Sequence, residues 1–143
     1  MKSLILAALV VTSVVAAARV DRPANGIVVT VQKTPPGDGK LMYASYCASC
    51  HGVYGKGNGP TAMLLRNRPA DLTALSRNNQ GKFPLENVKS ALEFGAPSPA
   101  HGSAQMPVWG PILHEMDGPY AGQLRGLQRI VSLSAYLESI QQK

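Results

Sequence analysis

Cysteine and large aromatic residues are scarce in this chain of 143 residues, which has 2 Cys, 1 Trp, 2 Phe and 5 Tyr. Two Cys cannot build the dense disulfide framework that stabilises many small exported domains. Charged residues are also few, at 15%, but 45% of the residues are hydrophobic, which excludes wholesale disorder. The 14 Gly and 11 Pro predict long loops. A loop-rich chain with so few large side chains is expected to need an additional group in its core.

An uncharged, largely apolar run of 15 residues, 4–18, follows Lys2 at the N-terminus. It is shorter than the ~20 apolar residues that a transmembrane helix needs. It ends in Ala16-Ala17-Ala18, small residues that suit a signal peptidase. We therefore interpret residues 1–18 as a secretory signal, with an uncleaved anchor as the alternative. The remaining chain would have no membrane span and would work in the periplasm, where unpaired thiols oxidise unless they are chemically occupied.

The rest of the chain divides into an N-terminal arm, residues 19–37, and a single domain, residues 38–143. The β-branched residues 26–31 could form one short strand in the arm. Helical spacing and capping signals predict helices over residues 39–50, 83–93 and 123–141, and a short helical turn over 61–65. Residues 95–119 hold four Gly and five Pro, so we expect an extended loop there. The fold class is therefore predicted to be all-α, a small helical domain with long loops.

Cys47-Ala48-Ser49-Cys50-His51 has the pattern C-x-x-C-H, the attachment signature of c-type haem. Two thiols three positions apart on a helical turn can add to the two vinyl groups on one edge of a porphyrin. The adjacent imidazole of His51 can then bind the iron. We therefore predict one haem c, attached through Cys47 and Cys50, which would also occupy both thiols in an oxidising compartment.

Three other interpretations compete with haem attachment. A short-loop disulfide between the two Cys would leave His51 without a role. A thioredoxin-like redox pair needs a strand immediately before the first Cys, but residues 41–46 have helical character. A zinc site needs four ligands, typically with two His separated by three to five residues, whereas His101 and His114 are 13 positions apart.

Met106 is the best candidate for a second axial ligand, because it lies in a Pro- and Gly-rich segment in which Pro107 fixes the backbone. Met42 and Met63 lie in helical contexts typical of core packing. His101 is a competing ligand, and His114 and Met116 are weaker ones. An open sixth position is also possible.

Together these features resemble a class I monohaem cytochrome c of the bacterial type, over about residues 38–141. Gly39 and Tyr43 precede Cys47 at the family's spacing, and Leu133 and Tyr136-Leu137 resemble its C-terminal helix. The resemblance implies the cytochrome c fold, in which these two helices cross near a right angle. A Gly at the crossing lets the two backbones approach.

The resemblance also implies roles for two further residues. Gly59-Pro60 resembles the family's Gly-Pro after the haem motif, so the Pro60 carbonyl would accept the Nδ1–H of His51. The segment His101-Gly102 to Met106-Pro107-Val108-Trp109-Gly110 resembles the distal loop of one bacterial subgroup. Trp109 would then pack against the haem edge or donate its indole N–H to a haem propionate. Arg66 and Arg68 either face a propionate or, as we favour, form a solvated face.

These features predict an exported cytochrome that transfers single electrons through a His51/Met106-ligated haem, rather than an enzyme. It would act as a soluble carrier or as the haem subunit of a respiratory or dehydrogenase chain, with redox proteins as partners. The alternatives are a haem enzyme or gas sensor with a labile sixth ligand, and an interaction subunit that docks to a larger membrane complex. The net charge of +6, or +5 after loss of Lys2, favours acidic docking surfaces. Nucleic acid is a poor partner because the basic residues are dispersed.

Overall fold

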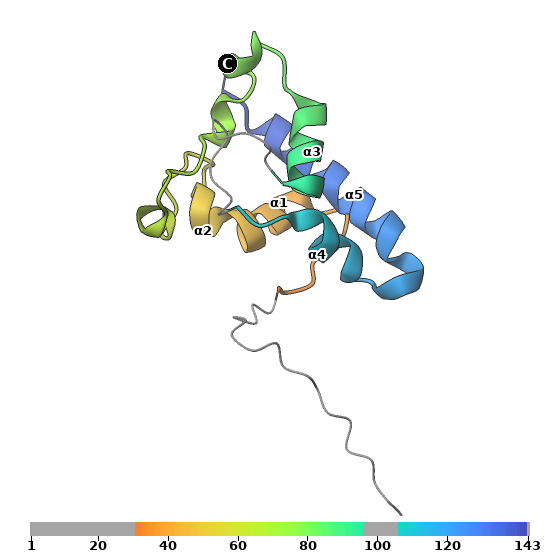
Figure 1. Cartoon of the computed structure of the whole chain (residues 1–143). Coiled ribbons are helices and arrows are strands. Elements are labelled where there is room, and N and C mark those ends of the chain that lie inside the picture. The colour runs from red at the N-terminus through yellow and green to blue at the C-terminus, as the bar shows by residue number, and fades with distance from the viewer. Residues whose placement is uncertain (1–30, 96–105, 143) are drawn as a thin grey trace, which may run out of the picture. The chain divides into compact units, whose positions relative to one another are not determined.

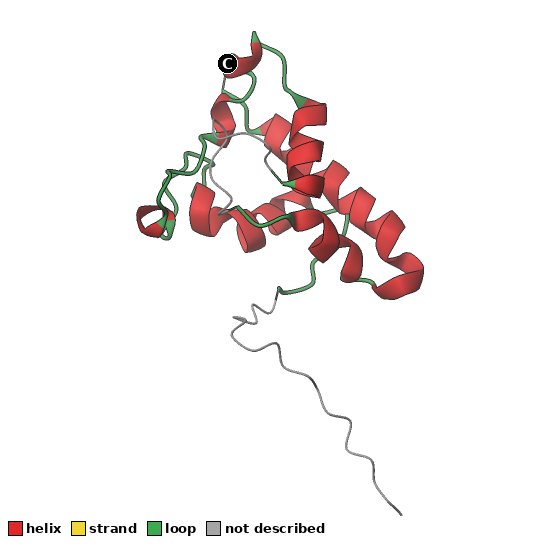
Figure 2. Ribbon diagram, viewed as in Figure 1, coloured by secondary structure: helices red, strands yellow, loops and turns green. Residues whose placement is uncertain are grey.

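A computed structural model describes residues 31–95 and 106–142 of the chain (Figure 1). The regular elements of these residues are all helical, as Figure 2 shows. The α-helices are α1 (Gly39–Met42), α2 (Ala48–His51), α3 (Leu85–Phe94), α4 (Trp109–Glu115) and α5 (Gly118–Ser139). A π-helical turn, η1 (Tyr43–Cys47), joins α1 to α2, and three 3-10 turns follow: η2 (Ala62–Leu64), η3 (Leu72–Ala74) and η4 (Arg77–Asn79). The predicted all-α class is confirmed, whereas the proposed strand at 26–31 lies outside the described residues except for Val31.

Local capping signals explain where several helices begin. The Asp38 carboxylate accepts a hydrogen bond from the Leu41 amide at 2.8 Å, so helical structure starts at Gly39 and continues through the C-x-x-C-H motif. Asp71 accepts from the Thr73 amide at 2.9 Å and starts η3 in the same way. α3 begins one residue after Pro84 and ends at Gly95, close to its predicted bounds.

The prediction that residues 95–119 form only an extended loop was wrong, because α4 and the start of α5 lie within them. Pro111 is the third residue of α4 and Pro119 is the second residue of α5. Amides in the first turn of a helix have no intrahelical acceptor, so proline is tolerated there. Proline, which breaks the interior of a helix, is therefore compatible with the first turns of α4 and α5.

Not all of the apolar residues that recur at helical spacing in α5 are buried. Leu124, Leu127 and Val131 are exposed, with 77%, 46% and 55% of their surface accessible. The buried positions near the start of the helix are instead Gly122 and Gly126. A Cβ on Gly122 would lie 2.0 Å from the His114 carbonyl oxygen of α4, so glycine is needed for this close approach.

The long helix α5 contacts α1, α3 and α4, and Figure 1 shows it in blue beside all three. The buried cluster between these helices consists of Met42, Tyr43, Tyr46, Val88, Leu92, Trp109, Leu113, Ile130, Leu133 and Leu137. Cys47 of the C-x-x-C-H motif packs against this cluster, and so does Met106, which lies before α4. The core therefore connects the two segments that carry the candidate ligands.

We expect Gly39→Ala to lower the free energy of unfolding by about 3 kcal/mol, because a side chain forced into a tight contact strains the structure. A Cβ at this position would lie 2.0 Å from the Ser132 carbonyl oxygen of α5, a backbone atom that cannot move independently. Denaturant unfolding measures the loss. Gly37→Ala is the control, because the nearest atom to its Cβ would be 3.8 Å away. Equal stability of the two variants would show that α1 and α5 do not cross at Gly39.

Candidate functional site

The two Cys of the motif lie where η1 passes into α2. Cys47 is the last residue of η1, and Cys50 lies in α2, three positions later. Both are free thiols and partly buried, so the structure does not form the disulfide that was one alternative. Burial and the neighbouring Cys50 raise the pKa of the Cys47 thiol to about 12. A π-helical turn is rare and often marks a functional site, and this one ends at the first of the two thiols.

His51 is the last residue of α2, and a hydrogen bond at its Nδ1 fixes the orientation of the ring. Its Nδ1 lies 3.0 Å from the carbonyl oxygen of Ala70, which accepts the ring N–H. Burial lowers the pKa of His51, which favours the neutral imidazole that binds metals. With Nδ1 donating to a carbonyl, Nε2 carries the lone pair that a metal ion takes.

The expected acceptor for His51, the Pro60 carbonyl, was therefore wrong. The Gly59-Pro60 pair packs against the backbone of α2 instead, since the Gly59 amide donates to the Cys50 carbonyl at 3.1 Å. A Cβ on Gly59 would lie 2.3 Å from the Ser49 carbonyl oxygen. Pro60 itself is exposed.

Hydrogen bonds along the following loop hold the Ala70 carbonyl in place. The Gly57 amide donates to the His51 carbonyl at 2.8 Å, and the Leu72 amide donates to the Gly55 carbonyl at 2.7 Å. The Tyr43 hydroxyl donates to the Gly52 carbonyl at 2.6 Å. These bonds connect η1, the loop and the start of η3, so the orientation of the His51 ring depends on all three.

A cavity of about 610 Å³ lies in the same loop, between residues 57 and 68. Its lining includes Pro60, Arg66 and Arg68 but none of the motif residues. Both arginines are exposed, in agreement with the favoured solvated face. The Arg68 Nε donates to the Gly57 carbonyl at 3.5 Å.

Met106 is partly buried, packs against the core cluster and lies just before α4. Trp109, the first residue of α4, is buried and stacks on Tyr46, with 5.5 Å between ring centroids and 26° between planes. In the sequence, only the position of Tyr46 directly before Cys47 points to this partner. The haem contacts predicted for Trp109 stay predictions.

The rivals of Met106 have other surroundings. His114 Nε2 lies 2.9 Å from Glu93 Oε1, and Met116 Sδ lies 3.8 Å from the Tyr46 hydroxyl. Met42 is fully buried in the core, as predicted, but Met63 is 93% exposed and does not fill the core as expected. His101 lies outside the described residues.

These residues fit a covalently attached haem. Two thiols that form no disulfide flank one helical turn. The neighbouring imidazole donates its Nδ1–H, and its Nε2 has no hydrogen-bond partner among the described residues. A thioether side chain is partly buried against the same apolar cluster. Imidazole and thioether are the axial donors of electron-transferring haem proteins.

A family model described as Cytochrome c matches residues 37–141. No curated protein and no solved structure matches the chain. The match covers most of the sequence and includes the C-x-x-C-H motif and all five α-helices. The chain therefore belongs to the cytochrome c family, whose members carry covalently bound haem c and transfer electrons through it.

Proposed function

We propose that this cytochrome carries single electrons through a haem whose axial ligands are His51 and Met106. The observation that carries the proposal is the hydrogen bond from His51 Nδ1 to Ala70, which leaves Nε2 as the metal-binding nitrogen. Met106 is favoured as the second ligand because it is partly buried beside the core. Its rival Met116 packs at the Tyr46 hydroxyl, and His114 pairs with Glu93.

When bound, the haem supplies a one-electron change at its iron, and the protein residues control how easily that change occurs. His51 and Met106 are both uncharged donors. The apolar cluster beside Met106 disfavours additional positive charge. Both effects favour the reduced state and a raised reduction potential, as suits an electron carrier.

We further propose that the protein is exported to the periplasm after removal of residues 1–18. There it would exchange electrons with redox proteins, as a free carrier or docked to a membrane complex. Within residues 31–95 and 106–142, no helix has both the length and the apolar character needed to span a membrane.

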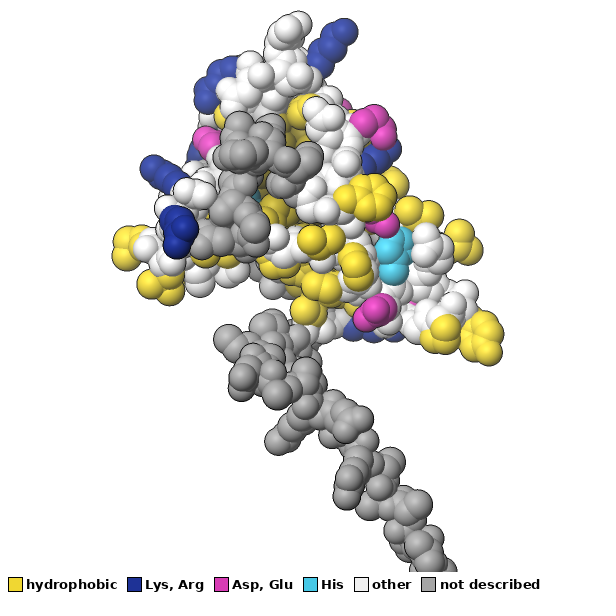
Figure 3. Space-filling model, viewed as in Figure 1, with side chains coloured by type: hydrophobic (Ala, Val, Ile, Leu, Met, Phe, Trp, Pro, Cys, Tyr) yellow, Lys and Arg dark blue, Asp and Glu magenta, His cyan; other side chains and the backbone are white. Residues whose placement is uncertain are grey.

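The surface supports weak docking rather than strong electrostatic capture. On the face in Figure 3, hydrophobic side chains gather near α4 and the end of α3, where Val108 and Phe94 are 44% and 77% exposed. The Lys and Arg side chains on this face are separated from one another. Such dispersed charge gives salt-sensitive steering toward acidic partners without a concentrated anion-binding surface.

Carbon monoxide binding to the reduced holoprotein at neutral pH tests this function against a haem enzyme or gas sensor. We expect little or no rapid binding, because Met106 fills the sixth position. The Met106→Ala variant serves as the positive control. Rapid binding by the unaltered protein would show that the sixth position is labile and would favour an enzyme or sensor.

A further inference from the structure

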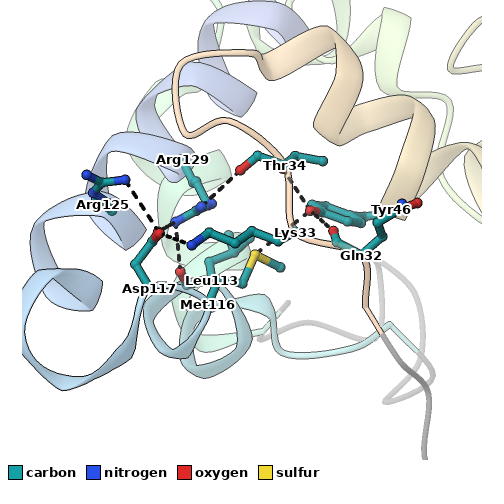
Figure 4. A network of polar contacts seen from close by, with 9 residues as sticks. All are labelled: Gln32, Lys33, Thr34, Tyr46, Leu113, Met116, Asp117, Arg125 and Arg129. Carbon is teal, nitrogen blue, oxygen red and sulfur yellow. Dashed lines mark hydrogen bonds and ion pairs between the residues drawn. The ribbon is translucent and has the colours of Figure 1, made fainter.

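Residues 32–34, which we call the strap, precede the part of the chain that the family model matches. The sequence suggested no role for them. In the structure, the Tyr46 hydroxyl donates to the Gln32 carbonyl at 2.6 Å and lies 2.7 Å from Thr34 Oγ1 (Figure 4). Thr34 is buried, with 5% of its surface accessible. The strap therefore covers the hydroxyl of the tyrosine that directly precedes Cys47.

A buried arginine of α5 fixes the strap to the neighbouring helices. Arg129 is fully buried, and its Nη2 donates to the Thr34 carbonyl at 3.0 Å. Its Nη1 donates to the Leu113 carbonyl of α4 at 3.4 Å and to the Asp117 carboxylate. One guanidinium thus connects the strap, α4 and the corner between α4 and α5 (Figure 4).

Asp117 holds the strap by a second connection. Its Oδ1 lies 2.6 Å from Lys33 Nζ and 3.5 Å from Arg125 Nη1. Hydrogen bonds from Lys33 and Arg129 lower the pKa of the Asp117 carboxyl to about 2. The carboxylate therefore stays ionised between its cationic neighbours at neutral pH.

The network continues from the strap to the helix that follows the candidate distal ligand. The Tyr46 ring stacks on Trp109, which lies three residues after Met106. Trp109 begins α4, and Leu113 of the same helix accepts the Arg129 hydrogen bond. The strap, Tyr46 and Arg129 thus constrain the helix that directly follows the Met106 segment.

Fold stability alone does not account for this arrangement. Buried ion pairs are weak sources of net stability, because desolvation of the two charges offsets their attraction. A buried guanidinium with several directed hydrogen bonds does specify the relative positions of the groups that it joins. Here those groups are the Thr34 and Leu113 carbonyls, which come from the strap and from α4.

We propose that the strap positions Tyr46 and Trp109 so that Met106 is held firmly at its ligand position. The proposal rests on the proposed function, because it takes Met106 as the second axial ligand. Tyr46 and Thr34 are then positioning residues, which act on the ligand through the stack and α4. A segment outside the family match would in this way set how readily an external ligand displaces the thioether.

To test the proposal, imidazole is titrated into the oxidised holoprotein. Binding is measured as the loss of the Met-to-iron charge-transfer band. Tyr46→Phe keeps the stacked ring but removes the hydroxyl that the strap holds. Thr34→Val removes the other hydroxyl without changing the side-chain shape. Loss of a buried hydrogen bond of about average strength predicts that each variant binds imidazole about fivefold more tightly. Thr34→Ser keeps the hydroxyl and should restore the affinity of the unaltered protein.

Ser134→Ala is the matched control, because it removes a fully buried hydroxyl of α5 that lies outside the strap network. The Ser134 hydroxyl donates to the Ile130 carbonyl of its own helix at 2.7 Å. Its loss should not increase imidazole affinity. If Tyr46→Phe and Thr34→Val behave like Ser134→Ala, the strap is only structural and the proposal is overturned. If the unaltered protein lacks the band, Met106 is not the ligand. The proposed function is then wrong, whatever the variants of the strap show.

Discussion

Replacing both Cys47 and Cys50 with serine is expected to abolish most of the stable holoprotein. Without thioether links, the haem can leave a chain whose core depends on it. The segment from 52 to 84 contains only short 3-10 turns as regular structure, so little secondary structure of its own supports it without the cofactor. Both thiols are partly buried and Cys47 packs against the apolar cluster, so the attached group would form part of the core.

The measurement compares pigment yield and thermal unfolding in a host that can attach c-type haem. Ser49→Ala is the control, because it alters an exposed residue between the two thiols and leaves both intact. In this control, acid–acetone extraction should leave the pigment on the polypeptide. A folded, haem-free Cys47→Ser/Cys50→Ser variant with normal stability would contradict the prediction.

Met106→Ala is expected to lower the reduction potential by on the order of 100 mV, because a thioether ligand favours the reduced iron. The variant should also bind carbon monoxide and imidazole at the vacated position. Potentiometric titration followed by optical spectra measures the first effect. Met63→Ala should leave the potential unchanged, because that side chain is 93% exposed.

The Met116→Ala variant tests which of the two methionines that flank α4 is the axial ligand. Met116 packs at the Tyr46 hydroxyl, so its loss should affect stability more than ligation. If Met116→Ala removed the charge-transfer band while Met106→Ala retained it, the ligand assignment would be reversed. An unchanged potential and spectrum in Met106→Ala alone would also eliminate Met106.

Local signals predicted the parts of this fold that short stretches of chain determine. The Asp38 cap, the helix through Cys47 to His51 and the stop at Gly95 all depend on residues within a few positions. The helix α4 escaped prediction because proline content alone does not show where a helix begins. Pro111 is compatible with a helix only because it falls in the first turn.

The candidate site shows the same division between local and distant determinants. The C-x-x-C-H motif identified Cys47, Cys50 and His51 from adjacent residues. The acceptor for His51 lies 19 positions away, at Ala70, and its identity depends on how the intervening loop folds. Arg129 and the Thr34 carbonyl are separated by 95 positions, so no local pattern could show that a charged residue of α5 would be buried.

The optical spectrum of the oxidised holoprotein at neutral pH tests the account most directly. Ligation by His51 and Met106 predicts a Met-to-iron charge-transfer band that disappears in Met106→Ala and persists in Met63→Ala. A spectrum of the unaltered protein without that band would contradict the account.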